Sequence, residues 1–320
     1  ASNTAVGYGS LDANVSGNRA VAIGVNALGS QTFTNSTNNY NVAVGYGAGE
    51  SITTAVQNTI IGGACGSSIT TGSYNSILGV TAGDAITTGA NNTSVGHGSL
   101  SANTTASNNT AVGKSALFAN TTGAQNTAVG EGALGANTTA SYNTALGENA
   151  LASNTTGTQN VAVGQATLDT NTTGDNNTAV GRDALTANTT ASNNTAVGKA
   201  ALTANTTGTQ NTAVGAQTLL ANTTGNYNVA VGVNTLLSNT TGNNNTALGT
   251  YALDSNTTAD HNIGIGASAL GANTTGGSNV AVGNYALDAN TTANSNTAVG
   301  YASLSANTTG SQNVSVGTLS

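Results

Sequence analysis

Residues 109–125 read NTAVGKSALFANTTGAQ, and this 17-residue unit, with its positions numbered 1 to 17, decides the fold of the 320-residue chain. Glycine stands at position 5 in all 19 copies of the unit, from Gly7 to Gly317, with one four-residue insertion between Gly24 and Gly45. A strict period of this size is typical of a solenoid, in which each unit lacks a core of its own and must stack on its neighbours. We therefore expect one elongated all-β body of parallel β-roll type, without a single active-site cleft.

The strand of each unit is predicted at positions 2 to 4, because β-branched and aliphatic residues stand there between Asn and Gly. We place positions 2 and 4 on the inner face of this strand. The invariant glycine predicts a corner with a positive φ or a close backbone approach. The predicted core residues are Val112 and Val129 of position 4 with Leu117 and Leu134 of position 9, and the corner residues are Gly113, Gly130, Gly147 and Gly164.

The array of residues 1–320 divides into three stretches. Residues 1–40 hold a longer rung near 31–39, where QTFTNSTNN should bulge as a loop, and residues 92–320 are regular NTAVGxxALxANTTG units. In the variant units of 41–91, position 9 is Gly and position 12 is Ile, whereas the regular units have Leu and Asn there. We infer that each rung buries one bulky aliphatic side chain, worth about 2 kcal/mol, by either of two routes. Both ends stop within the pattern without a polar capping unit, so we expect a piece of a longer fibre.

Position 3 is alanine in most units and lies on the face of the strand that we assign to the outside. A solvated strand face is normally polar. A column of small apolar residues there predicts contact with another copy of the chain, and hence a homo-oligomer. The residues proposed for this contact are Ala111, Ala128, Ala145 and Ala162.

Composition excludes several classes of function. Only 5% of the residues are charged, the net charge is −7, and the four basic residues form no cluster, which argues against nucleic acid as a partner. No apolar run approaches the roughly 18 residues of a membrane span. The 37% of hydrophobic residues recur at fixed positions, which argues against disorder. Cys65, the single cysteine, stands where other units have Ala, Ser or Thr and is interpreted as a small buried spacer.

The sequence gives no candidate for catalysis, a metal or a cofactor, and we predict that the chain is not an enzyme. His97 and His261 lie about ten units apart, so they cannot meet within one solenoid. The acidic residues lack the glycine-aspartate nonapeptide spacing that holds calcium in β-rolls. The glycines recur every 17 residues, whereas a phosphate-binding loop needs them within a few residues.

The tripeptide Asn-Thr-Thr begins at position 12 of thirteen successive units. Each copy satisfies the N-glycosylation pattern. The same asparagines would also stack as hydrogen-bonded ladders between rungs, as amides do in cross-β stacks. Both readings apply to Asn103, Asn120, Asn137, Asn154, Asn171, Asn188, Asn205, Asn222, Asn239, Asn256, Asn273, Asn290 and Asn307.

The strings NNTAVG at 108–113, YNVAVG at 227–232 and RAVAIG at 19–24 resemble the head repeat of YadA-like trimeric autotransporter adhesins. The longer string NTAVGxxALxANTTG is similar to repeat shafts of phage tail fibres. The resemblance covers the whole chain, although its period of 17 is longer than that of the head repeats. The resemblance implies a left-handed parallel β-roll in which three chains wind about one axis. It also implies an extracellular fibre, on a cell surface or a virion, that binds a receptor on another surface, such as a glycan.

Two other classes of function stay open. A monomeric solenoid could bind ice through regular threonines or glycans through its tyrosines. Alternatively, subunits could join end to end through their open strands into a self-assembling filament.

Overall fold

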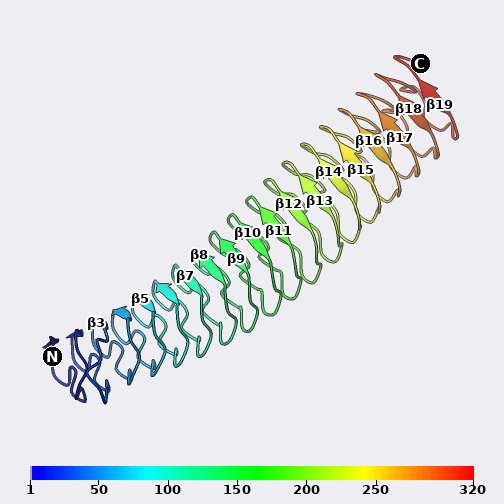
Figure 1. Cartoon of the computed structure of the whole chain (residues 1–320). Coiled ribbons are helices and arrows are strands. Elements are labelled where there is room, and N and C mark those ends of the chain that lie inside the picture. The colour runs from blue at the N-terminus through cyan, green and yellow to red at the C-terminus, as the bar shows by residue number, and fades with distance from the viewer. Residues whose placement is uncertain (1) are drawn as a thin grey trace. The chain divides into compact units, whose positions relative to one another are not determined.

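The computed structural model describes residues 2–320, and it is an all-β parallel β-solenoid in which each unit supplies one three-residue strand (Figure 1). Neighbouring strands pair in parallel and in register, so that Thr110 lies beside Thr127 and Val112 beside Val129. The chain forms two compact units, one that ends at Gln159 and one that begins at Asn160.

The strands all have the same length and recur once in each unit. In the first compact unit they are β1 (Thr4–Val6), β2 (Val21–Ile23), β3 (Val42–Val44), β4 (Thr59–Ile61), β5 (Ser76–Leu78), β6 (Thr93–Val95), β7 (Thr110–Val112), β8 (Thr127–Val129) and β9 (Thr144–Leu146). In the second they are β10 (Val161–Val163), β11 (Thr178–Val180), β12 (Thr195–Val197), β13 (Thr212–Val214), β14 (Val229–Val231), β15 (Thr246–Leu248), β16 (Ile263–Ile265), β17 (Val280–Val282), β18 (Thr297–Val299) and β19 (Val314–Val316).

The alanines of position 3 correct our assignment of the strand faces. They are fully buried inside the chain, so they form the core and offer no contact to a second copy. In strand after strand the middle residue is buried and the two residues that flank it are half-buried or exposed. The predicted oligomer contact was therefore wrong for Ala111, Ala128, Ala145 and Ala162.

The predicted core residues are buried to different extents. Leu117 and Leu134 of position 9 are fully buried, as predicted. Val112 and Val129 of position 4 are only half-buried, because they point to the side opposite the buried alanines. The interior is thus lined by alanine from the strand and by leucine from the segment that follows it.

The size of the leucine explains why the strand turns its smallest residue inward. Position 3 of β16 is Gly264, and a Cβ atom placed there would lie 3.3 Å from Leu253 Cγ, in the preceding rung. The leucine therefore leaves room for about one methyl group. A larger residue, Ile60, stands at position 3 where the preceding rung has glycine, Gly49, in place of the position 9 leucine. Its Cδ1 atom lies 3.0 Å from the point that a Cβ atom on Gly49 would occupy, so the isoleucine uses the space that the missing leucine leaves.

The variant units of 41–91 bury their isoleucines as expected. Ile52, Ile69 and Ile86 of position 12 are fully buried. The Cδ1 atom of Ile52 lies 3.1 Å from where a Cβ on Gly49 would be, so the isoleucine fills the space that a position 9 leucine fills elsewhere. The prediction of two routes to one bulky buried group per rung is confirmed.

Three residues besides the corner glycine adopt positive φ in a regular unit, which the sequence does not suggest. In the template unit they are Ser115 at 55°, Leu117 at 50° and Gln125 at 60°. Such a conformation costs a non-glycine residue about 1–2 kcal/mol. For Leu117 this cost is offset by burial, worth about 2 kcal/mol, and by the hydrogen bond from its N–H to the Ala133 carbonyl in the next rung.

The insertion near 31–39 contains no strand, as predicted, but only part of it faces solvent. Residues 34–36 are exposed. Phe33 and Asn39 are buried, and a Cβ on Gly17 would lie 2.8 Å from Phe33 Cδ2. The longer rung is therefore held against the rung before it through the phenylalanine.

Candidate functional site

The glycine corners bring the backbones of successive rungs into contact. The φ angles of Gly113 and Gly130 are 138° and 134°, and Gly147 and Gly164 have 140° and 135°. A Cβ on Gly113 would lie 2.5 Å from the carbonyl oxygen of Gly130. No side chain fits at that distance, so both parts of the prediction for position 5, a positive φ and a close backbone approach, are confirmed.

The asparagines of position 12 form a buried ladder of amide groups. Asn137 Nδ2 donates to Asn120 Oδ1 at 2.8 Å and to the Ala140 carbonyl at 3.0 Å. Its own Oδ1 accepts from Asn154 Nδ2 at 3.1 Å. The ladder prediction is confirmed, and the same bond to the preceding unit is made in the second compact unit by Asn188, Asn205, Asn222, Asn239, Asn256, Asn273, Asn290 and Asn307.

The glycosylation reading of the same residues does not fit the folded chain. The position 12 asparagines are fully buried from Asn103 to Asn290, and Asn307 is half-buried. A transferase must reach the Nδ2 atom, which in the ladder is hydrogen-bonded inside the core. The hydrogen-bonding demand of a buried amide therefore explains why position 12 stays Asn in these units.

A second asparagine ladder, at position 1, was missed by our reading of the sequence. The backbone N–H of Asn126 donates to Asn109 Oδ1 at 2.9 Å, and Asn126 Nδ2 donates to the Ala140 carbonyl at 2.8 Å. That carbonyl also accepts from Asn137, so the two ladders meet at one oxygen with two lone pairs. The sequence does indicate this ladder, because position 1 is Asn in every unit from Asn41 onward.

The two threonines of Asn-Thr-Thr have different surroundings. Thr121 of position 13 is half-buried, and its Oγ1 donates to the Thr138 carbonyl of the next rung at 3.0 Å. Thr122 of position 14 is exposed, as is every position 14 residue from Thr54 to Thr309, and all sixteen are threonine. Across residues 2–320, no protein hydrogen bond involves the Oγ1 of this column. We call these sixteen residues the threonine column.

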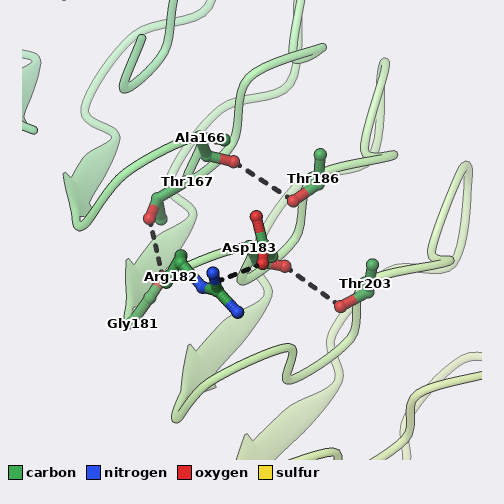
Figure 2. Close-up of polar contacts among 7 residues, drawn as sticks. All are labelled: Ala166, Thr167, Gly181, Arg182, Asp183, Thr186 and Thr203. Carbon is green, nitrogen blue, oxygen red and sulfur yellow. Dashed lines mark hydrogen bonds and ion pairs between the residues drawn. The ribbon is translucent and has the colours of Figure 1, made fainter. Parts of the chain in front are cut away.

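Further threonine hydroxyls bond to carbonyl groups of neighbouring rungs beyond the strands. Figure 2 shows three such contacts in the second compact unit, together with an ion pair of 3.3 Å between two partly exposed side chains. The hydroxyl contacts satisfy carbonyl groups at the turn, whereas an exposed ion pair stabilises little. They are Thr167 to Gly181 at 2.7 Å, Thr186 to Ala166 at 3.1 Å and Thr203 to Asp183 at 3.0 Å, and the ion pair is Arg182 with Asp183.

One hollow with a volume of about 390 Å³ lies on the first rungs. Two of its lining residues are joined, because Asn26 Nδ2 donates to Glu50 Oε1 at 3.2 Å. A Cβ atom on Gly9 would lie 2.5 Å from Asn26 Oδ1, so the glycine allows the asparagine side chain to pack closely at this lining position. The lining residues are Tyr8, Gly9, Asp12, Asn26, Gly29, Ser30 and Glu50.

The residues with reactive side chains lie apart from one another. His97 and His261 are exposed in different compact units. Cys65 is fully buried, and burial raises the pKa of its thiol to about 11. Among residues 2–320, no group of three or more His, Cys, Asp or Glu side chains is placed to hold a metal ion.

No protein-family model matches this chain, and no curated protein is significantly similar to it. In the described part of the chain, no helix has the length and the apolar character needed to cross a membrane.

Proposed function

We propose that the chain is a non-enzymatic, extracellular shaft for attachment, which carries a receptor-binding region away from a cell or virion surface or itself adheres. One observation supports this proposal above all. The buried side chains of a regular rung serve stacking, through two asparagine ladders and an aliphatic column that recur every 17 residues. The length of a stack of identical rungs grows in proportion to the number of rungs, and length is the property that a shaft needs.

The resemblance to adhesin heads and tail-fibre shafts supplies the finer parts of the proposal. The coil is left-handed, and three copies of the chain share one axis. The partners are these further copies and a receptor on a surface, with glycans among the candidates. The low content of charged residues, 5%, fits a shaft that does not attract ions or nucleic acid along its length.

Deletion of whole units tests the shaft function. Removal of residues 109–159, which are three complete units, preserves every kind of rung-to-rung contact and should shorten the reach by about 14 Å, at about 4.8 Å per strand. The matched control removes residues 109–150, which breaks the 17-residue phase and should unfold the adjoining rungs.

The measurement is the separation of two labelled tags, one at each end of the chain, by electron microscopy. The whole-unit deletion should reduce this separation and keep the β-sheet circular dichroism. A folded deletion variant whose tag separation is unchanged would refute the shaft.

The threonine column favours a second candidate function, ice binding. The column persists at Thr54, Thr71 and Thr88, where position 12 is Ile, so the glycosylation pattern does not explain it. Hydroxyl groups about 4.8 Å apart are too distant for a direct hydrogen bond, and we propose that water molecules bridge them. A file of water ordered in this way would favour contact with ice.

Thermal hysteresis of the purified chain tests this candidate. The intact chain should depress the freezing point below the melting point, and replacing Thr122 and Thr139 by Lys should reduce the effect. Absence of hysteresis from the intact chain would eliminate ice binding.

A further inference from the structure

The residue at position 17 forms an exposed bend ahead of each strand. Asparagine stands there in five units, with φ between 57° and 63°, and all five residues are exposed. Gln, Tyr, Ser and His occupy the same position in other units, also with positive φ, so the bend itself does not require asparagine. We call these five residues the bend asparagines, and they are Asn91, Asn108, Asn176, Asn193 and Asn244.

The side chains of the bend asparagines do not take part in the stacking of the rungs. Within the described residues 2–320, none of the five side-chain amides makes a hydrogen bond with another part of the chain. Their backbone does contribute, since the N–H of Asn108 donates to the Ala90 carbonyl at 3.1 Å. The amides of the two ladders, by contrast, are buried and hydrogen-bonded, as in Asn126 and Asn137. The amides of the bend asparagines are therefore accessible from solvent.

Each bend asparagine begins an Asn-x-Thr tripeptide whose middle residue alone is buried. In 108–110 the middle residue, Asn109, is buried in the position 1 ladder. Asn108 is exposed, and Thr110 at the start of β7 is half-buried, with an Oγ1 atom that makes no hydrogen bond within the described chain. Position 12 shows the reverse, because in 103–105 the asparagine is buried and the last threonine is exposed. The acceptor pattern for N-glycosylation is therefore presented to solvent at position 17 and hidden at position 12.

Asparagine occurs at position 17 only where a threonine stands two residues later. Eleven strands begin with Thr, and five of them come after a bend asparagine. The other eight strands begin with Val, Ile or Ser, and none of them comes after an asparagine at position 17. The residues at position 17 before these eight strands are Arg19, Tyr40, Tyr74, Gln159, Tyr227, His261, Ser278 and Gln312. The fold does not explain this pairing, because the two side chains form no hydrogen bond with each other, whereas an enzyme that recognises both residues does explain it.

We propose that the bend asparagines are sites of N-glycosylation. The co-substrate is an activated sugar, a nucleotide-linked or lipid-linked sugar diphosphate. The side-chain amide nitrogen forms a bond to C1 of the sugar, and the bond between C1 and the diphosphate oxygen breaks. The released diphosphate takes up the proton that the nitrogen loses. This proposal goes beyond the shaft function and does not depend on it.

The spacing of the rungs limits the size of the sugar. Asn91 and Asn108 lie on successive rungs, as do Asn176 and Asn193, and the strands of successive rungs are about 4.8 Å apart. Branched glycans on both members of such a pair would collide, so a single sugar or a short unbranched chain fits best. Modification at the bend leaves both asparagine ladders intact, because the bend asparagines belong to neither.

Treatment of the purified, folded chain with a soluble N-glycosyltransferase and UDP-glucose tests the proposal. Glycopeptide mass spectrometry should find a hexose on each bend asparagine. Occupancy of the buried position 12 asparagines should be at least about tenfold lower, because these amides react only when the stack opens locally. The peptide of residues 101–113 is the control, because it holds the tripeptides of Asn103 and Asn108 without a stack around them, and both should be modified there.

Two variants test the pairing with threonine. Thr110→Val should remove the hexose from Asn108 without harm to the fold, because β10 carries Val161 at the same position. The matched control, Thr127→Val, makes the same change two residues after Gln125 and should leave every hexose in place.

Three outcomes would each overturn the proposal. The first is a folded chain that gains no hexose on Asn108, whether or not the peptide gains one. The second is equal occupancy of Asn103 and Asn108 in the folded chain, which would show that burial does not select the site. The third is a hexose that remains on Asn108 in the Thr110→Val variant.

Discussion

Replacing Gly130 by Ala should break the stack at one rung. Its φ is 134°, and a Cβ atom there would lie 2.4 Å from the carbonyl oxygen and 2.6 Å from the carbonyl carbon of Gly147. Backbone strain of this kind costs about 1–3 kcal/mol. The overlap is with backbone, so rotation of a side chain cannot relieve it, and the two rungs must move apart.

That separation weakens the hydrogen bonds between the two rungs. The N–H of Thr127 donates to the Asn143 carbonyl at 2.9 Å, and that of Leu134 to the Ala150 carbonyl at 3.0 Å. Each such bond contributes about 1 kcal/mol. With the strain included, we expect the local free energy of unfolding to fall by about 3–5 kcal/mol.

Gly132→Ala is the matched control in the same rung. Gly132 also has a positive φ, of 67°, but the nearest atom to an added Cβ is Asn149 Oδ1, in a side chain that can turn away. Other units carry Ser115 and Ala166 at this position with φ of 55° and 52°. We expect a loss of about 1 kcal/mol for this variant.

Hydrogen exchange followed by mass spectrometry measures both variants. The amides of residues 127–150 should exchange much faster in Gly130→Ala, and those beyond residue 280 should exchange as in the unchanged chain, because rungs couple only to their neighbours. Equal protection of residues 127–150 in the two variants would refute the role that we give to the close backbone approach.

Three further predictions concern the core. Asn137→Leu should lower the free energy of unfolding by about 2–4 kcal/mol, because it leaves the buried amide partners of Asn137 unsatisfied. Thr139→Leu, at the exposed position 14, should change the free energy of unfolding by less than about 0.5 kcal/mol. Denaturant titration that finds equal losses in the two variants would contradict the ladder. Gly66→Leu should lower the free energy of unfolding by about 1–3 kcal/mol, because the added side chain overpacks against Ile69. Adding Ile69→Asn should restore part of this stability in a double-mutant cycle. Additive effects of the two changes would argue against a space that both side chains share. Burial raises the pKa of the Cys65 thiol from 9.0 to about 11, so the folded chain keeps that proton to higher pH than the unfolded chain, and the contribution of this thiol to stability should be constant below pH 9 and fall between pH 9 and 11. Comparison with Cys65→Ser isolates that contribution, and alkylation at pH 8.5 as fast as in urea would show that the thiol is not buried.

Periodicity predicted the parts of the fold that follow from one unit repeated in register. The strand at positions 2 to 4, the glycine corner and the exchange of Leu for Ile all depend on which residues never change and which change together. The faces of the strand were assigned wrongly because the larger residues were placed inside. The leucine of the next segment already fills the interior, so the strand can contribute only a methyl group. The pairings of Ile60 with Gly49 and of Ile77 with Gly66 held this information, since in these two rungs the strand residue is large where the preceding leucine is missing.

The turns were beyond what the sequence could predict. Leu117 and Gln125 adopt positive φ, although neither residue type favours that conformation. They do so because stacking on the neighbouring rungs outweighs local preference. The second asparagine ladder was missed for a related reason, since a residue at the start of a strand is ordinarily read as part of a turn.

The two asparagine ladders give the stack of the second compact unit a direction. From Asn188 to Asn307 every amide of position 12 donates toward the lower residue numbers, and the N–H groups of position 1 donate to side chains in the same sense. A break between two of these rungs would therefore leave N–H donors of the ladders without acceptors on the rung of higher residue number, and side-chain oxygens without donors on the rung of lower residue number. The two broken surfaces would not be equivalent, even though the rungs on either side of the break are nearly identical.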